Sequence, residues 1–178
     1  MNYADSKTHI DTAKKILKVN HAGEFGAINI YRSQIFISKL LNRSFVPLLE
    51  SFLNDEKRHL NIFWKEISKR NGIKCKSFWL CGAGGWVMGF VSALLGHKGV
   101  MACTWAVESV VASHLHNQLA YLETKNDLEA YKVVKSIIED EENHRDIGAA
   151  QGGTNYLYAP FRFIISLFTE LVIRFGMR

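Results

Sequence analysis

Two short stretches of sequence decide the fold, Asp55-Glu-Lys-Arg-His59 and Asp140-Glu-Glu-Asn-His144. Each contains a Glu-x-x-His motif, and each lies within a run of apolar residues that recur with helical spacing. Residues three apart in an α-helix share a face, so the glutamate and the histidine of each motif point the same way as the apolar residues around them. An unpaired carboxylate in a protein interior costs several kcal/mol. The two stretches therefore predict helices that bury charge and must neutralise it.

The apolar pattern predicts four long helices, of which these motifs occupy the second and the fourth. A period of 3.6 residues runs through residues 18–41, 46–70, 100–122 and 127–148. Asn71-Gly72 is a typical end signal for the second helix. Only two prolines occur in 178 residues and turn dipeptides are sparse, which argues against an all-β fold. The expected class is all-α, in a single domain covering residues 1–178.

The chain contains the same helical unit twice. In each half, 18–71 and 100–148, a helix with one glutamate on its apolar face precedes the helix with the Glu-x-x-His motif. The two glutamates lie 32 residues apart in the first half and 33 in the second, and equivalent residues of the halves lie 84 or 85 apart. Four carboxylates and two imidazoles inside four antiparallel helices are typical of the dinuclear iron or manganese site of ferritin-like bundles. The candidate metal ligands are Glu24, Glu56, His59, Glu108, Glu141 and His144.

Simpler interpretations exist for each of these features. A single Glu-x-x-His on a helix is usually a solvated pair, and the duplication is what favours a metal. Two divalent cations would cancel the charge of four buried glutamates, and iron and manganese accept the same ligand types. His114 is either a core histidine or a residue of the outer shell around the metals, and Tyr31 is interpreted as a packing residue.

Two apolar segments lie outside the predicted bundle. Residues 77–96 contain no formal charge but include five glycines, and residues 156–175 are rich in aromatic side chains flanked by arginines. The first is long enough to span a bilayer, but a span would place the two halves of the metal site on opposite sides of the membrane. We therefore expect a hydrophobic insert that lies on the bundle and dips into a membrane surface, and a C-terminal interfacial helix. The simpler alternative is that both segments only pad the bundle.

The net charge of +5 also favours a membrane partner. Basic residues are scattered without a basic helix face, so nucleic acid is not expected. Burying and neutralising four glutamates raises the net charge of the remaining residues from +5 to +9, which suits anionic lipid. The three cysteines form no Cys-x-x-Cys pair, consistent with a reducing cytosolic setting. The first 18 residues include two aspartates and no apolar core, unlike a secretory signal or a transit peptide.

Four longer stretches carry a resemblance to a known family. They are Asn20-His-Ala-Gly-Glu-Phe-Gly-Ala27, Asp55-Glu-Lys-Arg-His-Leu60, residues 93–108 (ALLGHKGVMACTWAVE) and residues 140–148 (DEENHRDIG). Together they resemble the demethoxyubiquinone hydroxylases over about residues 19–160. The resemblance implies a ferritin-like, membrane-associated di-iron monooxygenase of ubiquinone biosynthesis. Such an enzyme hydroxylates the ring of a polyprenyl demethoxy-benzoquinol with O2, and NADH is implicated as the reductant.

The resemblance also implies roles for individual residues and a location. All six candidate ligands match the family motif, and Asp55 is expected to support His144 as Asp140 supports His59. Leu115 departs from the family, in which an aromatic residue often follows the histidine, and the C-terminal tail matches only loosely. The expected location is peripheral, on the cytoplasmic face of a bacterial membrane or the matrix face of the mitochondrial inner membrane, with other ubiquinone-biosynthesis proteins as further partners.

Two rival functions use the same six ligands. One is a ferritin-like ferroxidase or rubrerythrin-type peroxidase without an organic substrate, and the other is an inactive membrane scaffold with a structural metal. Cage ferritins lack a glycine-rich apolar insert, and rubrerythrins often add a cysteine-iron module that this chain does not have. Prenyl length, native metal, electron donor and oligomeric state are open at this level.

Overall fold

Six α-helices follow one another along the chain in the structure, a computed structural model that describes residues 3–41 and 43–178, with side chains from residue 12 onward. Within those ranges there is no β-strand, so the predicted all-α class is confirmed. A π-helical turn (Ala149–Gly153) and a short 3-10 helix (Tyr156–Tyr158) precede the last helix. The helices are α1 (Tyr3–Leu40), α2 (Val46–Lys69), α3 (Phe78–Leu94), α4 (His97–Thr124), α5 (Leu128–Gly148) and α6 (Ala159–Met177).

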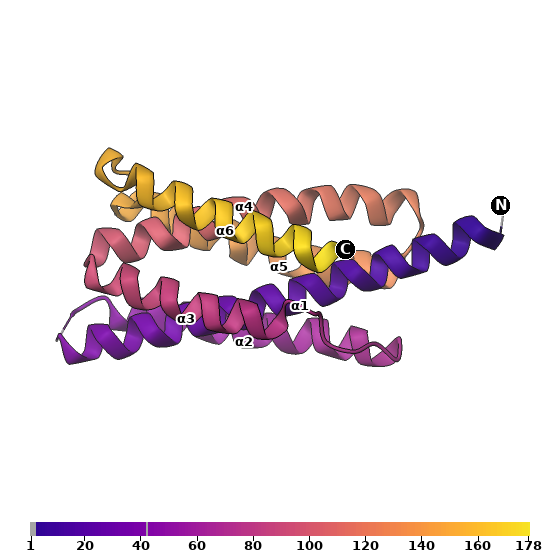
Figure 1. Cartoon of the computed structure of the whole chain (residues 1–178), viewed down its shortest axis with the longest axis horizontal. Coiled ribbons are helices and arrows are strands. Elements are labelled where there is room, and N and C mark those ends of the chain that lie inside the picture. Colours follow the sequence, from indigo (N-terminus) through magenta and orange to yellow (C-terminus); the bar gives the residue numbers. More distant parts are fainter. Residues whose placement is uncertain (1–2, 42) are drawn as a thin grey trace.

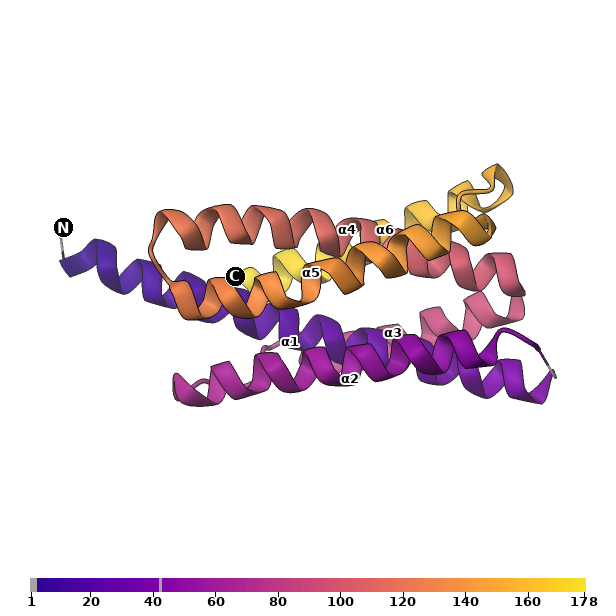
Figure 2. The same ribbon diagram turned by 180° about the vertical axis from the view of Figure 1, so that it is seen from behind.

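The helices form three layers of two. Helices α3 and α6 lie on one face of the molecule (Figure 1), and α2 and α5 lie on the opposite face (Figure 2). Helices α1 and α4 lie between them: α1 packs against α2 and α3, and α4 packs against α5 and α6. Helices α1, α2, α4 and α5 are the four helices expected for the bundle, and α3 and α6 cover one side of it.

The internal repeat comprises three helices in each half. The apolar segments at 77–96 and 156–175, expected as an insert and an interfacial helix outside the bundle, occupy equivalent places, because α3 lies along α1 as α6 lies along α4. Helix α3 is rich in glycine and α6 in aromatic residues, so their sequences hide the equivalence. Helix α1 also begins at Tyr3, much earlier than the expected residue 18. Most of the residues before 18 are polar, so the apolar period that sets the expected boundary is weak there.

Two apolar clusters hold the bundle together on either side of a charged middle. One contains Leu17, Phe63, Leu122 and Ile137, and the other contains Tyr31, Leu49, Phe52 and Met101, among further buried residues. Each of the helices α1, α2, α4 and α5 contributes to the two clusters and carries its predicted metal-site glutamate between them. The packing therefore brings four acidic side chains to the same level of the bundle.

Helix α3 approaches α1 closely because glycines line their contact. A Cβ atom on Gly85 would collide with the backbone oxygen of Gly26, and one on Gly89 would collide with the oxygen of Ile30. Backbone atoms cannot move aside cheaply, so these positions accept no side chain without separating the helices. Gly23, on α1, has open space where its Cβ would be.

We therefore expect Gly89→Ala to destabilise the fold by about 1–3 kcal/mol, because the added methyl group forces α3 away from α1. Gly23→Ala is the matched control, since it makes the same chemical change in a helix interior without a clash. It is expected to stabilise by about 0.5–1 kcal/mol through helix propensity. Urea unfolding midpoints measure the two effects, and equal shifts for the two variants would contradict the close packing.

Candidate metal centre

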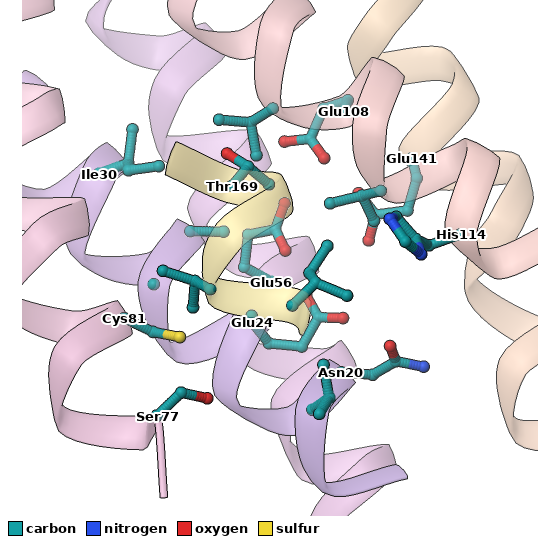
Figure 3. A pocket seen from close by; sticks show the side chains of 18 of the residues that line it. Asn20, Glu24, Ile30, Glu56, Ser77, Cys81, Glu108, His114, Glu141 and Thr169 are labelled. Atoms are coloured by element: carbon teal, nitrogen blue, oxygen red, sulfur yellow. The ribbon is translucent and has the colours of Figure 1, made fainter. Parts of the chain in front are cut away.

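The six predicted ligand side chains meet in the middle of the bundle. Each is at most 5% exposed, although all six are ionisable. Figure 3 shows the carboxyl groups of the four glutamates gathered beside one cavity. Ligand atoms of Glu24, Glu56, His59 and Glu141 lie within 4.8 Å of one another, and so do those of Glu56, Glu108, Glu141 and His144. These are two overlapping sets of side chains, each of which could hold a metal ion.

Glu56 and Glu141 belong to both sets, and each contacts the histidines of both halves. Nδ1 of His59 lies 2.9 Å from Glu141 Oε1 and 3.6 Å from Glu56 Oε2. Nδ1 of His144 lies 3.3 Å from Glu56 Oε1 and 3.8 Å from Glu141 Oε2. The two glutamates of the Glu-x-x-His motifs therefore occupy bridging positions, with Glu24 on one side and Glu108 on the other.

The outer nitrogen of each histidine faces an aspartate of the opposite half. Nε2 of His59 lies 3.1 Å from Asp140 Oδ2, and Nε2 of His144 lies 3.4 Å from Asp55 Oδ2. These are the two pairings that the family resemblance implies. A carboxylate at Nε2 holds the proton on that nitrogen and leaves Nδ1 free to bind a metal, which is the usual arrangement around metal-binding histidines.

The pKa values of the buried groups indicate that the cluster favours bound positive charge. Burial, followed by the charges of Glu141 and Glu56, raises the pKa of Glu24 and of Glu108 well above the ordinary value. Burial alone would also raise the pKa of Glu56, but the neighbouring imidazoles of His144 and His59 lower it to about 2. Burial opposes the charged form of His59, yet Glu141 and Glu56 raise its pKa to about 12. The buried carboxylates thus favour positive charge on the neighbouring imidazole of His59.

Several nitrogen and oxygen atoms of the cluster are buried without a hydrogen-bond partner. Such atoms are available to bind a metal ion. Among the described residues, the two carboxylate oxygens of Glu56, Oε1 of Glu141 and the Nδ1 atoms of His59 and His144 have no hydrogen-bond partner. Buried polar atoms are normally hydrogen-bonded. Oxygen and imidazole-nitrogen donors that converge in this way fit divalent iron or manganese.

Tyr31 takes a part in the site that the sequence did not predict. Its hydroxyl group is buried and donates a hydrogen bond of 3.3 Å to Glu108 Oε1. Burial, followed by the charge of Glu108, raises the pKa of Tyr31 well above its ordinary value, so it remains a donor. Its position seven residues after Glu24, on the same helix face, was the available signal.

His114 lies near the cavity but pairs with another helix. Its Nε2 atom is 2.6 Å from Glu170 Oε2, a residue of α6 that also accepts a hydrogen bond from Arg174. His114 and Leu115 both line the cavity, and Leu115 also belongs to an apolar cluster. The contact between His114 and Glu170 connects α4 to α6, and a place for His114 in the outer shell around the metals stays a prediction.

The cavity has a volume of about 80 Å³ and leads from the carboxylates toward α3 and α6. Four glutamates border it at one end, and its other walls are mostly apolar. Phe168 of α6 lines it and packs against Gly84 of α3, where an added Cβ would collide with the ring. The arrangement gives a small organic molecule a route to the acidic cluster.

We expect Glu108→Gln to abolish stabilisation by metal without harming the metal-free fold. Burial already favours the neutral form of Glu108, so an uncharged amide of the same shape is tolerated. Metal binding to the folded state raises its stability by mass action. Thermal melts with and without Fe²⁺ or Mn²⁺ should show a metal-dependent rise for the unaltered chain and none for the variant. A full metal-dependent rise in the variant would remove Glu108 from the ligand set.

Comparison with known proteins places the chain in a family. A family model described as "Ubiquinone biosynthesis protein COQ7" matches residues 11–176. The chain is 32% identical to the NADPH-dependent 3-demethoxyubiquinone 3-hydroxylase of Dictyostelium discoideum over 93% of its own length and 76% of that protein. It is 34% identical to the 3-demethoxyubiquinol 3-hydroxylase of Rhodospirillum rubrum, covering 78% of this chain and 64% of that protein. This chain therefore belongs to the COQ7 family of ubiquinone biosynthesis proteins.

Proposed function

We propose that the protein is a di-iron monooxygenase that hydroxylates the ring of a polyprenyl demethoxy-benzoquinol, using O2 and reducing equivalents. One observation carries the proposal: an apolar cavity runs from the α3 and α6 side of the bundle to four buried carboxylates. The names of its relatives, which are demethoxyubiquinone or demethoxyubiquinol hydroxylases, support the same substrate class. The reaction would be a step of ubiquinone biosynthesis.

The six predicted ligands would hold two iron ions, which would supply the activation of O2 when bound. Glu56 and Glu141, which belong to both sets, would help to hold both ions, together with Glu24 and His59 at one and Glu108 and His144 at the other. Tyr31, as a hydrogen-bond donor to Glu108, would restrict the position of that carboxylate. Asp55 and Asp140 would orient the histidines. Manganese suits the same donors.

The cavity walls would select and orient the substrate. Apolar side chains from four helices would exclude water and bind the ring, and an apolar lining lowers the cost of removing a hydrophobic substrate from lipid. A polyprenyl tail is insoluble in water, so it would remain in the bilayer while the ring enters. For the reductant, NADH and NADPH are the candidates, because several relatives are named as NADPH-dependent.

We also propose that α3 and α6 dock on a membrane surface. The two helices lie on the same face of the molecule (Figure 1), and each exposes large apolar side chains. Lys74 precedes α3 in the chain, and Arg174 lies in the last turn of α6. By length and composition, residues 156–177 could cross a membrane. Ile165 of α6 is nevertheless buried in a cluster with residues of α1 and α4, which favours a helix lying on the bundle. The exposed apolar residues are Trp79, Leu80, Trp86, Val87, Val91 and Leu94 on α3 and Phe163, Ile164, Leu167, Leu171 and Phe175 on α6.

The proposed location is peripheral, on the cytoplasmic face of a bacterial membrane or the matrix face of the mitochondrial inner membrane. Relatives named as mitochondrial and a relative from a bacterium are consistent with either one. Other ubiquinone-biosynthesis proteins are proposed as partners at this surface. The ferroxidase or peroxidase alternative is not favoured, because the matched relatives are hydroxylases and an apolar cavity has no role for a substrate that is only iron or peroxide.

Hydroxylation can be tested with the purified protein, Fe²⁺, a reductant, ¹⁸O2 and a short-chain demethoxy-quinol. We expect one ¹⁸O atom in the ring of the product by mass spectrometry, and none with Glu108→Gln, which removes a ligand from one end of the site. His116→Gln, a change at an exposed histidine on α4, is the control and should retain activity. Iron oxidation without ring hydroxylation would support a ferroxidase, and bound metal without either reaction would support a scaffold.

Membrane docking can be tested by flotation with vesicles of phosphatidylcholine and phosphatidylglycerol. We expect Val87→Glu combined with Phe163→Glu to weaken binding about tenfold or more, since two apolar side chains that would enter lipid become charged. Leu128→Glu is the matched control, because Leu128 is 63% exposed but belongs to α5, on the other side of the bundle. Equal flotation of the double variant and the unaltered protein would exclude the α3 and α6 face as the docking surface.

A further inference from the structure

A single arginine connects the two histidine supports of the metal centre. Nη2 of Arg58 donates a hydrogen bond of 2.7 Å to Asp140 Oδ2 and lies 3.3 Å from Asp55 Oδ1. The aspartates in turn contact Nε2 of His59 and His144. The result is a continuous chain of polar contacts that begins at one metal-site histidine, crosses α2 and α5, and ends at the other.

This connection is not part of the internal repeat. The residue equivalent to Arg58, 85 positions later, is Asn143, which is exposed and has no charge to offer. One guanidinium group therefore serves the aspartates of both halves. Its planar shape and several donors allow it to bind two carboxylates at once, which a lysine ammonium does less well.

Removing Arg58 would leave two carboxylates facing each other. The two aspartate oxygens lie within 3.3 Å of the same nitrogen atom, and each aspartate side chain is about one-third exposed. Like charges at such a separation repel, and partial exposure allows both side chains to turn toward water. Nε2 of each histidine would then lose its partner, and Nδ1 would no longer be held toward the bridging glutamates.

We propose that Arg58 is a positioning residue for the metal centre, which holds both histidine–aspartate pairs in the arrangement that binds metal. The proposal rests on the proposed function, since it assumes that the six ligands bind two ions. Arg58 acts on metal affinity rather than on the stability of the fold, because an ion pair with a side chain that is 47% exposed contributes little to folding.

The test is a titration with Co²⁺ alone, followed by its visible absorption, which reports both affinity and ligand geometry. We expect Arg58→Ala to weaken Co²⁺ binding about tenfold or more, in the range seen when outer-shell partners are removed, and to alter the absorption bands. Arg58→Lys should restore part of the affinity. Urea unfolding of the metal-free variants should match the unaltered chain, which separates positioning from misfolding.

Lys57→Ala is the matched control, because it removes one positive charge from the adjacent position of α2, where the side chain is exposed. It should change Co²⁺ affinity by no more than about twofold, as expected for a screened surface charge. In a background that already carries Asp55→Asn and Asp140→Asn, Arg58→Ala should add no further loss. Equal effects of Arg58→Ala and Lys57→Ala, or a full additional loss in that background, would overturn the proposal. Failure of the unaltered chain to bind Co²⁺ would instead overturn the metal centre.

Discussion

Four carboxylates share the interior of one small helical bundle, and the rest of the structure is arranged around neutralising them. Glu24, Glu56, Glu108 and Glu141 are each 5% exposed or less, and burial, followed by the charges of Glu141 and Glu56, raises the pKa of Glu24 and of Glu108. Two histidines and a tyrosine hydroxyl group supply part of the compensation. Two divalent cations would supply the remainder, and apolar clusters on either side fix the distance between the acidic groups.

The same repeated unit produces two different surfaces because its third helix differs between the halves. Helix α3 carries glycines against α1 and packs without space between the backbones. Helix α6 carries Phe168 and other large side chains, and a cavity remains beneath it that reaches the acidic cluster. A symmetrical pair of tightly packed helices would have closed the bundle. The asymmetry leaves one open route on the side that we propose to face the membrane.

Much of the fold and of the candidate site could be predicted from sequence because buried charge is rare and leaves a regular pattern. The two Glu-x-x-His motifs, with partner glutamates at matched spacing, identified all six side chains that the structure brings together. The third helix of each half was harder to predict. In α3, Gly82, Gly85 and Gly89 are required by close packing and do not follow an apolar period. Contacts such as Tyr31 with Glu108, His114 with Glu170, and Arg58 with two aspartates depend on the angles between helices. No local pattern in the chain encodes those angles.

The central claim is that six side chains enclose a pair of metal ions, and an anomalous-difference map measured at the iron absorption edge tests it most directly. For crystals of the iron-loaded protein, the account predicts two peaks. One lies beside Glu24 and His59, the other beside Glu108 and His144, and both lie within reach of Glu56 and Glu141. A single peak, or iron bound only at the molecular surface, would contradict the account.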